Sequence, residues 1–150
     1  MKTRGLLVCF YFFSLVGLVG CGDSTSELTK ALLTDLNNVR DLMAKNVDTP
    51  AEGMKLLRAY AQDHLPNFVR NVTQLYVDID KIPAPEDRAK RVKQIIEELK
   101  PALKSLSEQG NKFSNKAATD PKAMELQQQW AKDWQATFKE IGTLMQGFSL

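Results

Sequence analysis

Apolar residues recur at helical spacing along most of this chain and predict four helical segments. The segments run from about residue 25 to 46, from 49 to 82, from 85 to 108 or as far as 116, and from 120 to 147. Within each segment, apolar residues stand three or four positions apart, which places them on one face of a helix. No stretch alternates apolar and polar residues as a strand would, so the sequence predicts an all-α fold.

Capping residues mark where these helices begin. Ser24 precedes Glu27 by three positions, which is the spacing of a capping box. Thr49-Pro50 and Asp120-Pro121 each place a capping side chain before a proline, and proline suits the first helical turn. The stretch 111–119 is polar and rich in Asn and Ser, so we predict a loop or a frayed helix end there.

Short connections between helices of similar length favour an up-down four-helix bundle. The alternative is a three-helix bundle with a mobile arm. The fourth helix is expected to bury an apolar stripe made of Met124, Gln127, Ala131, Trp134, Phe138, Ile141, Met145 and Phe148. Trp130 and Trp134 make this face aromatic, which indicates core packing first and a surface that contacts a partner as the alternative. Trp130 lies beside the stripe, so it is the better of the two candidates for that surface.

The N-terminal residues follow a different pattern. Lys2 and Arg4 precede an apolar run from Leu6 to Val19. As a helix this run would be about 21 Å long, which is shorter than the ~30 Å hydrocarbon core of a bilayer. A short apolar run behind positive charges therefore predicts a cleaved export signal and not a permanent membrane span.

The apolar run ends in Leu18-Val19-Gly20-Cys21, which resembles the lipobox of bacterial lipoproteins. The resemblance implies cleavage before Cys21, a diacylglycerol on its thiol and an acyl chain on the new N-terminus. The chain then divides into a signal peptide (1–20), a lipidated tether (21–24) and a helical domain (25–150). Two or three lipid chains anchor a protein stably to a membrane without spanning it. Gly22 departs from the aspartate that retains such proteins in the inner membrane, so the periplasmic leaflet of the outer membrane is expected where two membranes exist.

Removal of the signal changes the charge of the chain. The whole chain carries a formal charge of +2, but Lys2 and Arg4 leave with a signal that contains no acidic residue, so the rest is neutral. A nucleic-acid partner would need a basic excess, and none is expected. Of the two cysteines, Cys9 leaves with the signal and Cys21 is lipidated, so the helical domain has neither a free thiol nor a disulfide.

The chemistry available to the helical domain is limited by its single histidine, His64. Di-iron bundles need two Glu-x-x-His motifs, and covalent haem attachment needs a C-x-x-C-H run. The chain has no glycine-rich phosphate loop. We therefore expect no catalytic residues, no metal, and no cofactor apart from the covalent lipid on Cys21.

Counting residues from each predicted turn places two interior prolines, Pro66 and Pro101, at the same height in the bundle. Each proline removes a backbone hydrogen bond and kinks its helix. Trp134 and His64 should lie within a turn of this layer, and Phe68 should lie beside it. One interpretation is a bundle that simply curves. The other is a widened pocket lined by His64, Phe68 and Trp134 that holds an apolar ligand.

The same counting places the turn near residues 82–85 at the end of the bundle next to the lipid anchor. A candidate membrane contact at that end consists of Arg88, Lys90, Arg91, Lys93 and Phe148. Basic side chains near an anionic surface contribute about 1 kcal/mol each at best. The alternative is an ordinary solvated helix face, in which neighbouring acidic residues balance the charge.

These observations predict a lipid-anchored, periplasm-facing helical protein without enzymatic activity. The leading hypothesis is a scaffold or accessory protein that binds another protein of the cell envelope. The alternative is a carrier or sensor of a small apolar ligand held in the pocket at the proline layer.

Overall fold

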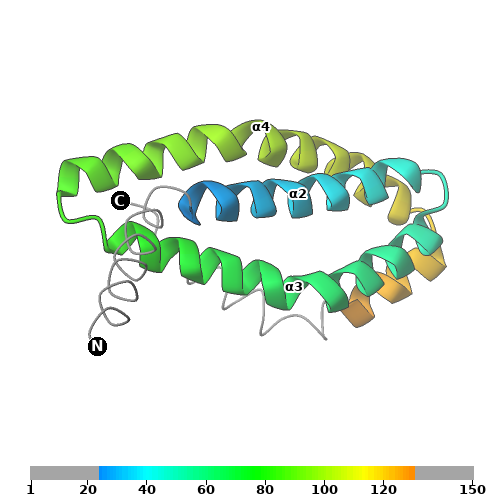
Figure 1. Ribbon diagram of the computed structural model, residues 1–150. Coiled ribbons are helices and arrows are strands. Elements are labelled where there is room, and N and C mark those ends of the chain that lie inside the picture. Colours follow the sequence, from blue (N-terminus) through cyan, green and yellow to red (C-terminus); the bar gives the residue numbers. More distant parts are fainter. Residues whose placement is uncertain (1–23, 131–150) are drawn as a thin grey trace, which may run out of the picture.

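A computed structural model describes residues 24–130 of the 150-residue chain. Three long helices, α2 (Ser24–Lys45), α3 (Pro50–Asp80) and α4 (Pro85–Ala117), are followed by a further helical stretch over residues 121–130 (Figure 1). These four helices pack against each other, and residues 24–130 contain no strand. The all-α helical bundle expected from the apolar periodicity is therefore confirmed.

The long helices run alternately up and down, and α2 is the central one. It packs along both α3 and α4, whereas those two helices contact each other less (Figure 1). The start of α2 lies beside the end of α3 and the start of α4, because Ser24 bonds to Asp78 and Thr25 bonds to Arg91. This is the arrangement that short turns between antiparallel helices impose.

The buried apolar side chains form two clusters, one towards each end of the bundle. Near Ser24 the cluster contains Leu32, Val72, Leu75, Ile79 and Ile95. At the other end it contains Met54, Leu57, Phe113, Ala117 and Ala123. Among the described residues, the two clusters share no member.

α4 continues to Ala117, so the longer of the two predicted ends, near residue 116, is confirmed and the predicted loop at 111–119 is mostly helix. The polar composition of this stretch was misleading. Phe113 and Ala117 are 3 % and 2 % exposed, and they extend the buried face of α4 by one more turn. Burying a Phe side chain contributes about 1.5–3 kcal/mol, which outweighs the weak helix preference of the Asn and Ser residues around it.

The fourth helix begins where the sequence predicted but presents a different face to the core. Asp120 caps it by accepting hydrogen bonds from the backbone amides of Lys122 (2.9 Å) and Ala123 (3.2 Å). Ala123 is fully buried, whereas Met124 is 44 % exposed. The inward face is rotated by one residue from the predicted stripe, so Gln127 is exposed and the half-buried Trp130 packs on the core cluster. Of the two interpretations of Trp130, core packing is therefore correct and the surface contact is not.

The other two predicted caps differ in detail. Pro50 occupies the first position of α3 as expected, but the Thr49 side chain makes no capping hydrogen bond. Ser24 uses its hydroxyl to donate a hydrogen bond to the Asp78 carboxylate, 3.0 Å away on α3. Ser24 therefore connects two helices at this end of the bundle.

Asp78 joins three hydrogen-bond donors at the end of α3. Its carboxylate accepts from Lys81, Gln74 and Ser24 at 2.9, 2.9 and 3.0 Å. The bond from Lys81 is the main cause that lowers the pKa of Asp78 below 3.8, and the bonds from Gln74 and Ser24 lower it further. A carboxyl with a lowered folded-state pKa stabilises the fold above its unfolded pKa, and this stabilisation is lost as the pH falls through the folded value.

We therefore expect Asp78→Asn to lower the free energy of unfolding by about 0.5–1 kcal/mol near neutral pH. The difference from the native protein should shrink as the pH falls below 3.8. Urea unfolding followed by circular dichroism at several pH values measures both effects. Asp80→Asn is the control, because Asp80 is 68 % exposed and its ion pair with Arg88 is solvated. A deficit of Asp78→Asn that is equal at all pH values would contradict the prediction.

Candidate functional site

The two interior prolines stand at the middle of the helices that flank α2. Pro66 lies inside α3 and Pro101 lies inside α4. Figure 1 shows both helices bowed, with the bend about half way along each. A proline inside a helix removes the backbone hydrogen bond to the residue four positions earlier, which for Pro66 is Gln62. The bends expected at both prolines are therefore present.

A cavity of about 260 Å³ lies between α2 and α3 on the Pro50 side of Pro66. Its walls are almost entirely apolar, and its lining extends to Leu106 of α4 and to Trp130. The remaining lining residues are Asp35, Leu36, Val39, Leu57, Tyr60, Ala61, His64, Leu65 and Phe68. An engineered apolar cavity of about 150 Å³ is enough to bind benzene, so this one has room for a small apolar molecule.

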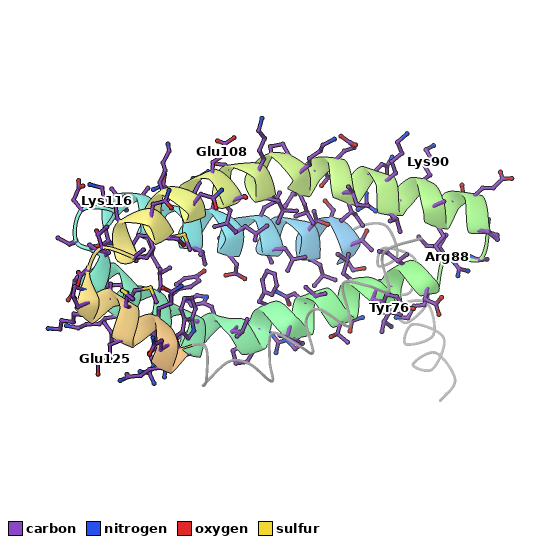
Figure 2. All side chains as sticks on the ribbon, turned by 180° about the vertical axis from the view of Figure 1, so that it is seen from behind. Tyr76, Arg88, Lys90, Glu108, Lys116 and Glu125 are labelled. Atoms are coloured by element: carbon purple, nitrogen blue, oxygen red, sulfur yellow. The ribbon has the colours of Figure 1, made fainter. Side chains whose placement is uncertain are left out.

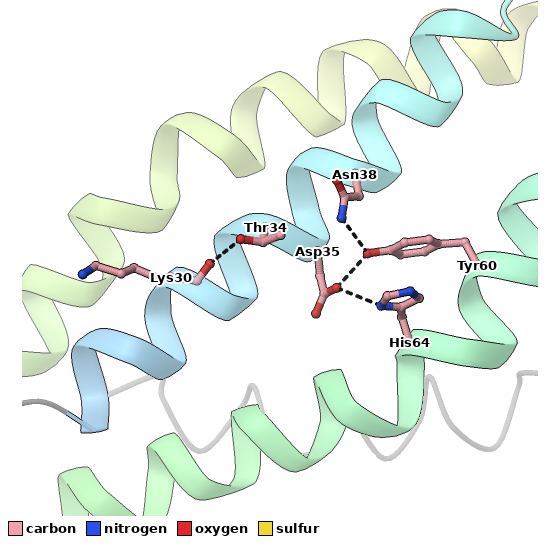
Figure 3. Close-up of polar contacts among 6 residues, drawn as sticks. All are labelled: Lys30, Thr34, Asp35, Asn38, Tyr60 and His64. Atoms are coloured by element: carbon pink, nitrogen blue, oxygen red, sulfur yellow. Dashed lines mark hydrogen bonds and ion pairs between the residues drawn. The ribbon is translucent and has the colours of Figure 1, made fainter.

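The polar edge of this cavity is formed by three side chains from α2 and α3 (Figure 3). The Tyr60 hydroxyl donates a hydrogen bond of 2.7 Å to Oδ1 of Asp35. Nδ1 of His64 lies 3.5 Å from the same oxygen. The rings of Tyr60 and His64 stack with their centres 4.0 Å apart, as residues four positions apart on a helix can do. Asn38 completes the group by donating to the Tyr60 oxygen at 3.2 Å.

The Tyr60 hydroxyl is held in its neutral form. Burial raises its pKa above 10, and the hydrogen bond to Asp35 raises it further, since a phenolate beside a carboxylate would be repelled. Tyr60 therefore acts as a hydrogen-bond donor and not as a base. Together, Asp35, Tyr60 and His64 can bind a polar group of a ligand.

The structure brings together two of the three residues predicted for the pocket. His64 and Phe68 both line the cavity, and the His64 side chain is 47 % exposed at its edge. Trp134 lies outside the described residues, and Trp130 lines the cavity one helical turn earlier. Asp35 and Tyr60 were not among the predicted residues. The spacing of Tyr60 and His64 on one helix face was the available signal, but nothing in the sequence placed Asp35 opposite them.

A second cavity of about 500 Å³ lies between α3 and α4 towards the Ser24 end, with Leu32 of α2 also in its lining. Two apolar side chains of α4 that line it are well exposed: Ile96 at 49 % and Leu103 at 43 %. This space follows from the weak contact between α3 and α4. Lys100 and Lys104 are the only charged residues among its described lining residues, so it contains no described acidic group.

The four basic residues predicted to contact a membrane lie at the Ser24 end of the bundle, but two of them hold the fold together. Arg91 donates two hydrogen bonds, of 2.7 and 3.0 Å, to the buried Thr25 hydroxyl. Arg88 pairs with Asp80 and donates to the carbonyl of Ile82, which closes the turn between α3 and α4. Lys90 and Lys93 are exposed, and Lys90 points away from the bundle in Figure 2.

The other predicted features of that end lie outside the described residues. These are the signal peptide, the lipidation site Cys21 and the aromatic residue Phe148. Within residues 24–130, no helix is both long enough and apolar enough to cross a membrane. In the same range, no three His, Cys, Asp or Glu side chains gather in a way that could hold a metal ion.

The cavity edged by Asp35, Tyr60 and His64 is the candidate functional site of the described domain. Comparisons of this chain with protein-family models, with curated proteins and with solved structures found no match.

Proposed function

We propose that this protein is a lipid-anchored, non-enzymatic binding protein of the cell envelope that holds a small, mainly apolar ligand in the cavity between α2 and α3. The observation that carries the proposal is the cavity itself, an apolar space of about 260 Å³ with one polar edge. Small-molecule sites commonly combine apolar walls with a few polar groups that orient the ligand.

The lipid anchor in this proposal is inferred from the lipobox-like sequence Leu18-Val19-Gly20-Cys21. Ser24 is the described residue nearest to Cys21 in the sequence, and it lies at the same end of the bundle as the turn between α3 and α4. Lys90 and Lys93 near this turn are exposed and available to an anionic surface. The cavity lies about half way along the bundle, so a ligand could enter it from the aqueous side. A carrier or sensor at a membrane needs both an attachment to the membrane and a binding site that its ligand can reach.

Filling the cavity is the direct test of this proposal. The protein is a chain of residues 21–150 with Cys21→Ser, which keeps the whole of the described bundle, and the probe is 1-octanol measured by calorimetry. Ala61→Leu places a larger side chain in the lining and is expected to weaken octanol binding by about tenfold or more, which corresponds to 1.4 kcal/mol.

The matched control is Ala59→Leu, which makes the same chemical change at an exposed position on the same helix. Octanol binding by this variant should equal that of the parent chain. Native mass spectrometry of the lipidated protein, purified from its membrane, should also reveal a co-purified small molecule. Equal octanol affinity in the two variants, or no binding by the parent chain, would refute the proposed site.

A further inference from the structure

The charge at the edge of the cavity restricts which ligands fit it. Among the described lining residues, Asp35 is the only acidic side chain, and no lysine or arginine lines the space. Because an apolar wall screens charge poorly, a single carboxylate dominates the potential inside such a cavity.

The Asp35 carboxylate lacks a permanently charged partner. Its side chain is only 16 % exposed, and within residues 24–130 no Lys or Arg forms an ion pair with it. Its Oδ1 accepts from the neutral Tyr60 hydroxyl at 2.7 Å and faces His64 at 3.5 Å. Its Oδ2 makes no hydrogen bond with another described residue and carries no dashed line in Figure 3. A carboxylate oxygen only accepts hydrogen bonds, so Oδ2 can accept one from a donor group of a ligand.

The aromatic rings beside the carboxylate favour the same kind of group. Tyr60 and His64 stack against each other next to Asp35, and Trp130 lines the cavity with them. Aromatic faces attract cations, and sites for ammonium groups commonly combine such faces with a carboxylate. An anionic headgroup, in contrast, would be repelled by Asp35 and would find no lysine or arginine among the described lining residues.

We propose that the ligand is a cationic amphiphile, with an ammonium group at Asp35, Tyr60 and His64 and a hydrocarbon part in the cavity between α2 and α3. This inference rests on the proposed function and adds the charge of the ligand to it. A charge-assisted hydrogen bond from the ammonium group to Oδ2 would add to the bond that Oδ1 accepts from Tyr60.

Three probes with the same chain and different headgroups test the charge preference. Octylamine, 1-octanol and octanoate are titrated by calorimetry into residues 21–150 with Cys21→Ser, at pH 7.5 and below their micelle concentrations. Octylamine is expected to bind at least about tenfold more tightly than octanoate, with octanol between them. This ranking is measured on the unsubstituted site, so it does not depend on whether a variant folds.

Two substitutions identify the source of the preference. Asp35→Asn keeps an oxygen that can accept from Tyr60 but removes the charge, and it should bring the octylamine and octanoate affinities to within about threefold of each other. Asp63→Asn removes one negative charge from an exposed residue that does not line the cavity, so it should leave the preference unchanged. Two results would overturn the assignment to Asp35. In one, Asp35→Asn still prefers octylamine over octanoate; in the other, both variants lose this preference equally.

The probes also separate this inference from the proposed function. Similar binding of all three probes, or tighter binding of octanoate, overturns the cationic ligand but leaves the apolar site intact, provided that Ala61→Leu still weakens binding. If none of the three probes binds, both the cationic ligand and the proposed function are refuted. The cavity is then not open to a ligand in the complete domain.

Discussion

Replacing Phe113 with alanine is expected to destabilise this protein by about 3–5 kcal/mol, because apolar contacts are lost and a cavity is left. Phe113 is 3 % exposed and packs in the core cluster with Met54, Leu57 and Ala117. Domains of this size are typically stable by about 5–15 kcal/mol, so this one substitution could remove most of the stability.

Urea unfolding monitored by circular dichroism measures the effect of Phe113→Ala. Ile96→Ala is the matched control, since Ile96 belongs to the same helix but is 49 % exposed, and it should change the free energy of unfolding by no more than about 0.5 kcal/mol. The comparison also tests whether the end of α4 is a structural helix. If stretch 111–117 were a frayed end in solution, the two variants would be about equally stable.

The second large effect is expected at Gly53, which is buried in α3 against that same ring. A Cβ atom at position 53 would lie 2.6 Å from Cε2 of Phe113 and 2.8 Å from Cβ of Asn46. Alanine favours a helix over glycine by about 1 kcal/mol, but overpacking of this kind costs about 1–3 kcal/mol. Gly53→Ala should therefore lower the free energy of unfolding by up to about 2 kcal/mol, because the helix preference offsets only part of the clash.

Gly110 offers a control that separates the clash from helix propensity. It also lies inside a helix, but the atom that a Cβ at position 110 would approach most closely is Sδ of Met43, at an ordinary 3.9 Å. Gly110→Ala should therefore stabilise the protein by up to about 1 kcal/mol. In a Phe113→Ala background the cost of Gly53→Ala should fall, since contacting residues are not additive. A stabilising Gly53→Ala would show that Phe113 and Asn46 do not approach α3 this closely in solution.

Much of the fold could be predicted from the sequence because the signals are local. Apolar spacing, the prolines at the helix starts and the Asp120 cap act within a few residues of each other, and all of them are confirmed. The two bends also follow from local chemistry, since a proline lacks the amide that its helix needs. The errors occurred where a local signal was ambiguous. Both Met124 and Ala123 begin a plausible helical stripe, and only packing against Phe113 and Ala117 buries Ala123.

The candidate site also contains some residues that could be predicted from the sequence and others that could not. His64 and Phe68 were placed near the proline layer by counting along antiparallel helices, and both line the cavity. Asp35 could not be found in this way, because it lies on α2 and its nearness to Tyr60 depends on how two helices are rotated about their axes. A change of one residue in that rotation turns a side chain by about 100°, which is enough to move it from the cavity to the solvent.

The sequence by itself determined the approximate limits and the alternating direction of the helices, the neutral charge expected after signal removal, and the lipobox-like Cys21. Only the tertiary structure decided that α2 is central, that Trp130 faces inward and that Asp35 meets Tyr60 and His64 at the edge of an apolar space. The physical reason is the range of the forces involved. Helix formation depends on hydrogen bonds and side chains within one or two turns, whereas the position of each helix depends on close packing between residues distant in the sequence.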